Sequence, residues 1–142
     1  MKIKYLRLKN WLLVSLAGLL GINVSCDEMV SEYGCPVADY KIKGKVSDPN
    51  GNPITGIEVE TRWVKDTTKS DGSYALLIND FPVETNTFDV AFTDIDGAEN
   101  GLYKNDTVPV TFQHSELTDG DGNWYEGSAT KTLNVTLQPV EK

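Results

Sequence analysis

Short runs in which apolar and polar residues alternate constrain the fold of this chain more than any other feature. After residue 26 no segment carries an apolar stripe at the 3.6-residue period of a helix, whereas about seven short runs alternate with a period of two. Turn residues separate these runs at near-regular intervals and are densest in Asp48-Pro-Asn-Gly-Asn-Pro53. Such spacing is typical of all-β domains, and it predicts a seven-stranded antiparallel Greek-key sandwich of two sheets.

Apolar residues at every second position predict which side chains point inward. In the run 40–46, lysines occupy the face opposite the apolar residues, and charged side chains separate the apolar ones between residues 57 and 63 in the same way. The inward faces of different runs should meet in one core, since burying each large apolar side chain contributes about 1.5–3 kcal/mol. The inward set includes Tyr40, Ile42, Val46, Val59, Trp63, Phe88, Val90 and Phe112.

Two local patterns refine this expectation. The segment 66–69, the turn Ser70-Asp-Gly72 and the run 73–78 predict a hairpin, because Asp-Gly marks a tight turn between two candidate strands. Near the C-terminus, Leu133, Val135 and Leu137 alternate again and predict the last strand.

The first 25 residues have the pattern of an export signal. Four basic residues precede an uncharged run of 12, Trp11 to Ile22, which is too short to span a bilayer as a helix. The run ends in Asn23-Val-Ser-Cys26, and a small residue before cysteine is the site that lipoprotein signal peptidase cuts. We therefore expect a signal peptide over 1–25, acyl chains such as palmitate on Cys26, a tether over 26–39 and a domain over 40–142. Several acyl chains attach a protein to a membrane stably.

One position departs from the usual lipoprotein signal, because Asn23 stands where leucine is common, three residues before the cysteine. The alternative is an ordinary secretory signal that is cleaved nearby. With acylation of Cys26, Cys35 is the only remaining thiol and no disulfide can form within the chain.

The charge balance argues against nucleic acid as a partner. All four charged residues of the segment 1–25 are basic, so removing them from the 13 basic residues leaves 9 against 21 acidic ones, a net charge of −12. Binding to phosphates requires clustered cations, and an acidic surface repels a polyanion.

Residues 44–78 resemble the carboxypeptidase regulatory-like, or transthyretin-like (prealbumin-like), β-sandwich domain. The resemblance is carried by Gly44-Lys-Val46, Gly51-Asn-Pro-Ile-Thr-Gly-Ile-Glu-Val59 and Thr68-Lys-Ser-Asp-Gly-Ser-Tyr74. Most of the chain after the expected signal peptide is similar to a family of lipoproteins named for their genes' proximity to radical SAM enzymes. That similarity is carried by Glu32-Tyr-Gly-Cys-Pro36, Asp39-Tyr40, Asp94-Ile-Asp-Gly97, Asn100-Gly101, Trp124-Tyr125 and Gly127. It implies a prealbumin-like fold and a lipoprotein of the Gram-negative envelope, in the outer membrane, associated with radical SAM chemistry.

Few residues could support catalysis. His114 is the only histidine, so a nucleophile activated by histidine or a zinc site of the Cys/His kind would depend on it. The hydroxyisourate hydrolases of the transthyretin class use more than one histidine and a C-terminal Tyr-Arg-Gly-Ser, whereas this chain ends in Gln-Pro-Val-Glu-Lys142. We expect a non-catalytic protein that acts as a binding or structural module.

Cys35 offers a competing hypothesis. It lies between Gly34 and Pro36 in the expected tether, where an enzyme could reach its side chain. A radical SAM enzyme that acted on the chain could modify this thiol, which would make the protein a maturation substrate. The alternative is a cysteine that packs against the domain edge or forms an intermolecular disulfide.

Trp124 and Tyr125 follow the glycine-rich acidic loop Asp119-Gly-Asp-Gly-Asn123. Aromatic residues on a loop at one end of a sandwich commonly form a recognition patch, here for an envelope protein or a glycan. The alternative is that Trp124 covers the open end of the core.

A second acidic loop predicts a cation site. Asp94, Asp96 and Glu99 surround Gly97 after the run that ends at Phe92, and oxygen ligands at alternate positions suit Ca²⁺. The alternative is an Asx turn, in which the carboxylates accept hydrogen bonds from nearby amides. The two acidic loops should lie at opposite ends of the sandwich, since the run 108–112 separates them.

Overall fold

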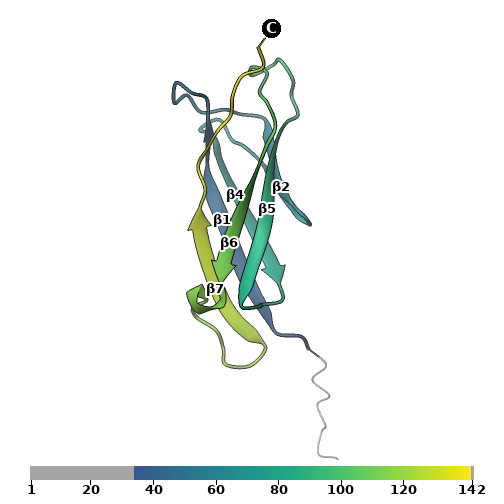
Figure 1. Ribbon diagram of the computed structural model, residues 1–142, viewed down its shortest axis with the longest axis vertical. Helices are drawn as coiled ribbons and strands as arrows, with labels where there is room; N and C mark the ends of the chain where they lie inside the picture. Colours follow the sequence, from purple (N-terminus) through teal and green to yellow (C-terminus); the bar gives the residue numbers. More distant parts are fainter. Residues whose placement is uncertain (1–33, 142) are drawn as a thin grey trace, which may run out of the picture. The chain divides into compact units, whose positions relative to one another are not determined.

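A computed structural model describes residues 34–141 of the chain. They form two four-stranded sheets that face each other (Figure 1), which confirms the all-β prediction. This part of the chain contains no helix with the length and hydrophobicity of a membrane span. The strands are β1 (Val37–Ser47), β2 (Ile57–Thr61), β3 (Val64–Thr67), β4 (Ser73–Asp80), β5 (Thr85–Asp94), β6 (Asp106–Gln113), β7 (Tyr125–Thr132) and β8 (Val135–Thr136), with a 3₁₀ turn, η1, at His114–Glu116.

The first sheet has the order β4-β1-β7, and β8 also pairs with β1. β1 and β4 are antiparallel, but β1 pairs with both β7 and β8 in parallel, so the expectation of wholly antiparallel strands is wrong for this sheet. β6 runs toward the end of the domain where β1 begins, and the chain crosses there into β7, which therefore runs in the same direction as β1 (Figure 1). Alternation along a strand is the same in either direction, so the sequence pattern could not reveal this.

The second sheet, in the order β3-β2-β5-β6, is antiparallel throughout. The predicted hairpin between the segments 66–69 and 73–78 is wrong, because β3 and β4 belong to different sheets. The turn itself is present, with Gly72 at φ +74° and its amide donating to the carbonyl of Lys69 over 2.8 Å. It carries the chain from one sheet to the other, where a hydrogen bond links the edge strands β3 and β4: the Ala75 amide donates to Oδ2 of Asp66 over 2.9 Å.

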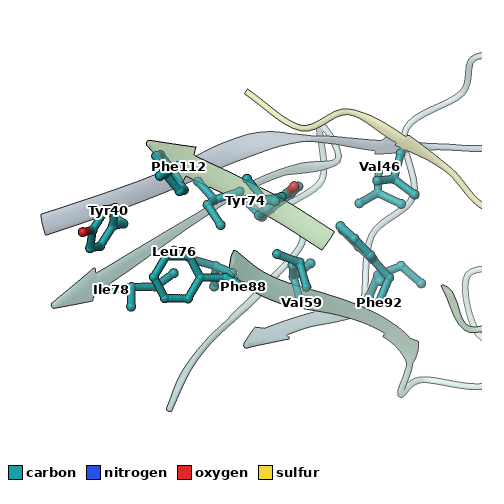
Figure 2. Close-up of a cluster of buried hydrophobic side chains, with 14 of the residues drawn as sticks. Tyr40, Val46, Val59, Tyr74, Leu76, Ile78, Phe88, Phe92 and Phe112 are labelled. Atoms are coloured by element: carbon teal, nitrogen blue, oxygen red, sulfur yellow. The ribbon is translucent and has the colours of Figure 1, made fainter. Parts of the chain in front are cut away.

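The inward side chains of both sheets form one core (Figure 2), as the alternation predicted. Tyr40, Phe88 and Phe112 pack with ring centroids 5.1–6.0 Å apart. Val59 and Val90 are fully buried between the sheets. These contacts come from strands of both sheets, so the core holds the layers together.

Trp63 is not part of this core, and its expected inward position is wrong. The residue is 83% exposed because Thr61 pairs with Val64, which leaves Arg62 and Trp63 as the two-residue turn of the β2–β3 hairpin. The alternation in the sequence continues past the end of the strand, whereas the backbone reverses at Arg62 with φ +24°.

The segment that follows β7 passes close to β1. A Cβ atom at Gly44 would lie 1.8 Å from the carbonyl oxygen of Leu133, so only glycine allows this approach. The side chain of Asn134 replaces a backbone carbonyl by accepting a hydrogen bond from the Lys45 amide over 2.9 Å. The hydroxyl of Tyr74 donates to the same Leu133 carbonyl over 2.7 Å.

Candidate functional site

The end of the domain where β1 begins brings the segment before the first strand against the loop before β7. The Val37 amide donates to the Trp124 carbonyl over 2.8 Å. A Cβ atom at Gly34 would lie 3.3 Å from the Trp124 ring, so the indole packs on the backbone of Gly34. The segment that carries Cys35 and the expected recognition patch are therefore neighbours, although about 90 residues separate them in the sequence.

Cys35 itself is exposed and forms no disulfide. Its flanking residues differ in their contacts, since Gly34 touches Trp124 whereas Pro36 is half-buried next to the start of β1. The thiol is thus accessible to a large partner at the end of the domain. Modification of Cys35 remains a prediction.

Cys26, the expected acylation site, lies outside the described residues, as do the expected signal peptide over 1–25 and the tether up to residue 33. β1 begins at Val37, so residues 37–39 of the expected tether belong to the sheet. They pair with β7, where Asp39 lies opposite Ser128. The sequence signal for this extension is weak because the inward residue here is the small Ala38.

Asp39 connects three strands at this end, a role that the sequence pattern did not predict. Its Oδ2 atom accepts a hydrogen bond from the Tyr125 hydroxyl over 3.2 Å, and its Oδ1 atom accepts one from Nδ2 of Asn79 over 2.9 Å. Burial raises the pKa of the Tyr125 phenol, and the neighbouring Asp39 carboxylate raises it further. Tyr125 is therefore held as a neutral hydrogen-bond donor across β1 and β7.

Trp124 and Tyr125 have different environments despite their adjacency. Tyr125 is half-buried and tied to Asp39, whereas Trp124 is 36% exposed and rests on Gly34. Two further apolar side chains are exposed in the connection between β4 and β5, which lies at the same end of the domain: Phe81 and Val83. This end combines an accessible thiol with several exposed apolar groups, which suits contact with another surface better than contact with water.

The acidic loop after β5 has the contacts of an Asx turn. The two carboxylate oxygens of Asp94 accept hydrogen bonds from the amides of Gly97, over 3.1 Å, and Tyr103, over 2.8 Å. Asp96 accepts one from Nδ2 of Asn100 over 2.5 Å. Within residues 34–141 no three histidine, cysteine or acidic side chains come together as metal ligands. The structure thus does not bring Asp94, Asp96 and Glu99 together as the expected Ca²⁺ site, and Asp94 has the contacts of an Asx turn.

The two acidic loops lie at opposite ends of the domain (Figure 1), as their separation by β6 predicted. The loop before β7 surrounds a shallow hollow of about 320 Å³ with Gly120, Gly122 and Asn123. Nε2 of His114 lies 3.6 Å from Oε2 of Glu126, and both side chains are partly exposed. The only histidine thus takes part in a surface pair next to this loop.

Comparison of the chain with models of protein families gives no match. Comparison with curated protein sequences also gives no match. The resemblances to carboxypeptidase regulatory-like domains and to radical SAM-associated lipoproteins therefore remain predictions.

Proposed function

We propose that this chain is a non-catalytic lipoprotein of the bacterial cell envelope, anchored through acylated Cys26, whose β-sandwich serves as a binding or structural module. The observation that supports the proposal best is the apolar end of the domain. Trp124, Phe81 and Val83 are exposed where the chain enters β1. A chain from Cys26 to Gly34 spans at most about 30 Å, so an anchored domain would keep this end near the lipid surface.

We also propose that the sandwich has the Greek-key topology of prealbumin-like, carboxypeptidase regulatory-like domains. Two four-stranded sheets are consistent with this class. The glycines of the resembling segments have structural roles that support it: Gly44 allows the approach of Leu133, and Gly56 has φ +82° and leaves no room for a Cβ beside Asp96.

Metabolic labelling with an alkyne fatty acid tests the anchor. The full chain expressed in a Gram-negative host should take up the label and fractionate with outer membranes. Cys26→Ala should abolish labelling, whereas Cys35→Ala should leave it unchanged and so serves as the matched control. Label in the Cys26→Ala protein would contradict the anchor assignment.

A second candidate function is that of a substrate for a radical SAM enzyme, modified at Cys35. The exposure of this thiol at the end of the domain favours it. Intact mass spectrometry of the native protein tests it, since a new covalent link at Cys35 would change the mass of a peptide from residues 27–40. An unmodified Cys35 in protein from the native organism would exclude this function.

A further inference from the structure

The outer face of the first sheet carries a row of lysines along its central strand. Lys41, Lys43 and Lys45 are exposed at alternate positions of β1. Their neighbours on the flanking strands are uncharged: Leu77, Ala75 and Ser73 on β4, and Thr130 and Thr132 on β7. Lys69, which lies in the connection before β4, adds a fourth ammonium group at the same edge.

A groove accompanies this row. It has a volume of about 520 Å³ and is lined by the four lysines together with Thr132 and Asn134. The short side chains of Ser73 and Ala75 lie along the same groove and leave it open beside β1. One groove thus offers ammonium groups, which can bind an anion, beside hydroxyl and amide groups, which can bind a polar ligand.

The charge of this groove contrasts with that of the chain, which has 21 acidic and 13 basic residues. Within the described part of the chain, Lys45 is the only one of the four lysines in a salt bridge, with Nζ 3.4 Å from Oδ2 of Asp71. The outer face of the second sheet carries Glu58, Glu60 and Asp89 together with Lys65, whose Nζ lies 3.0 Å from Oε2 of Glu58. Four lysines therefore gather along one groove of an acidic protein.

We propose that this groove binds an extended acidic polysaccharide, with Lys41 and Lys43 as the main cationic contacts. Adjacent lysines of the row are two residues apart on a strand, about 7 Å, so their charges form a linear array that suits a ligand with regularly repeated anionic groups. Thr132 and Asn134 supply hydrogen-bonding groups for sugar hydroxyls at the edge of the groove. This binding would give the ligand class of the envelope module proposed above.

Two other polyanions fit the groove less well. A single-stranded nucleic acid binds through base stacking on exposed aromatic rings, but Tyr74, the only aromatic residue lining the groove, is 3% exposed. An acidic bilayer would meet the end of the domain near the anchor before it met the flank of the sheet, where the lysines lie. An oligosaccharide has the width and the polarity that a groove along one strand accepts.

Isothermal titration calorimetry of the full chain in a neutral detergent tests the proposal. The probes are alginate oligosaccharides, which carry one carboxylate on each sugar, and neutral dextran oligosaccharides of the same length. Alginate should bind, dextran should not, and the affinity for alginate should fall as NaCl screens the lysines. Lys41→Ala/Lys43→Ala should weaken binding at least about tenfold, since hydrogen bonds to charged groups commonly contribute that much.

The matched control is Lys65→Ala/Lys104→Ala, which removes two exposed lysines from outside the groove and should leave the affinity within about twofold. An equal loss in both double variants would contradict the groove, and so would the absence of heat with alginate. Tighter binding of poly-glutamate or of phosphatidylglycerol vesicles than of alginate would contradict the polysaccharide. Unfolding midpoints of the variants exclude a folding defect. Acylation of Cys26 is a separate readout, so failure of the anchor and failure of the groove can be told apart.

Discussion

The hydroxyl of Tyr40, on β1, donates a buried hydrogen bond to Oδ1 of Asn86, on β5, over 3.0 Å, and so joins the two sheets through the core. Asn86 is 8% exposed, and its polar groups are engaged further. Oδ1 also accepts from the Val83 amide over 3.0 Å, and Nδ2 donates to the Phe81 carbonyl over 3.0 Å. One side chain therefore holds the β4–β5 connection and the opposite sheet together.

Removal of Asn86 should destabilise the domain more than removal of the Tyr40 hydroxyl. Asn86→Ala leaves the Tyr40 hydroxyl, the Val83 amide and the Phe81 carbonyl without this partner, at a cost of about 1–3 kcal/mol for each group that stays buried. Tyr40→Phe removes one donor, while Oδ1 of Asn86 keeps the Val83 amide, and should cost about 1 kcal/mol. Urea unfolding measures both. A larger loss in Tyr40→Phe would show that the Asn86 contacts are not the main link.

Stability should decrease at alkaline pH because of buried tyrosines. Burial raises the pKa of the Tyr40 and Tyr74 phenols above their ordinary value of 10.0. Below pH 10 both phenols are protonated in the folded and in the unfolded chain, so their contribution to the free energy of unfolding is fully present there. Above pH 10 the unfolded state releases them first, and stability falls as the pH rises through the folded-state values.

Thermal unfolding between pH 8 and pH 11 measures this decrease. Tyr74→Phe removes one titrating group and should make the decrease shallower. Substitution of an exposed residue such as Leu77→Ala keeps both phenols, so its decrease should match that of the original chain. Identical slopes for Tyr74→Phe and Leu77→Ala would contradict the role of burial at Tyr74.

Substitution by alanine should have very different effects on stability at two aromatic residues that the alternating pattern placed in the core. Phe112 is fully buried and Trp63 is 83% exposed. Phe112→Ala should cost about 3–5 kcal/mol through the cavity that it leaves. Trp63→Ala and Glu58→Ala should each cost less than about 1 kcal/mol, although Glu58 accepts a hydrogen bond from Lys65 at the surface. Equal urea midpoints for the Phe112 and Trp63 variants would mean that the strand faces are wrongly assigned.

Ca²⁺ should not stabilise the domain, because no three candidate ligands come together within residues 34–141 and Asp94 is part of an Asx turn. Thermal unfolding with increasing Ca²⁺ should give a constant midpoint, whereas a bound ion would raise it with concentration. Asp94→Ala should lower the midpoint in the absence of Ca²⁺, since it leaves the Gly97 and Tyr103 amides without their acceptor. A Ca²⁺-dependent rise that Asp94→Ala abolishes would restore the cation site.

Alternation in the sequence was sufficient to predict the all-β class and most of the core, because burial on one face of a strand imposes a period of two. The alternation misled at Trp63, because β2 ends before the alternating pattern does. It also missed Ala38, because β1 begins before the pattern becomes visible. The direction of β7 and the link between Asp39 and Tyr125 depend on long-range pairing, which local periodicity does not encode. The lysine row was visible at alternate positions, but its groove needs Thr132 and Asn134 from the far end of the chain.

The parallel pairing of β1 with β7 and β8 has a consequence for how the domain folds. β1 precedes β7 and β8 by many residues, yet one of its two sides is completed by contacts from that part of the chain, such as the Lys45–Asn134 hydrogen bond, which spans 89 residues. Such high contact order predicts slow folding, in which one edge of β1 stays unpaired until β7 and β8 have docked. A chain truncated before Tyr125 would keep that edge permanently, and aggregation rather than partial function would be its fate.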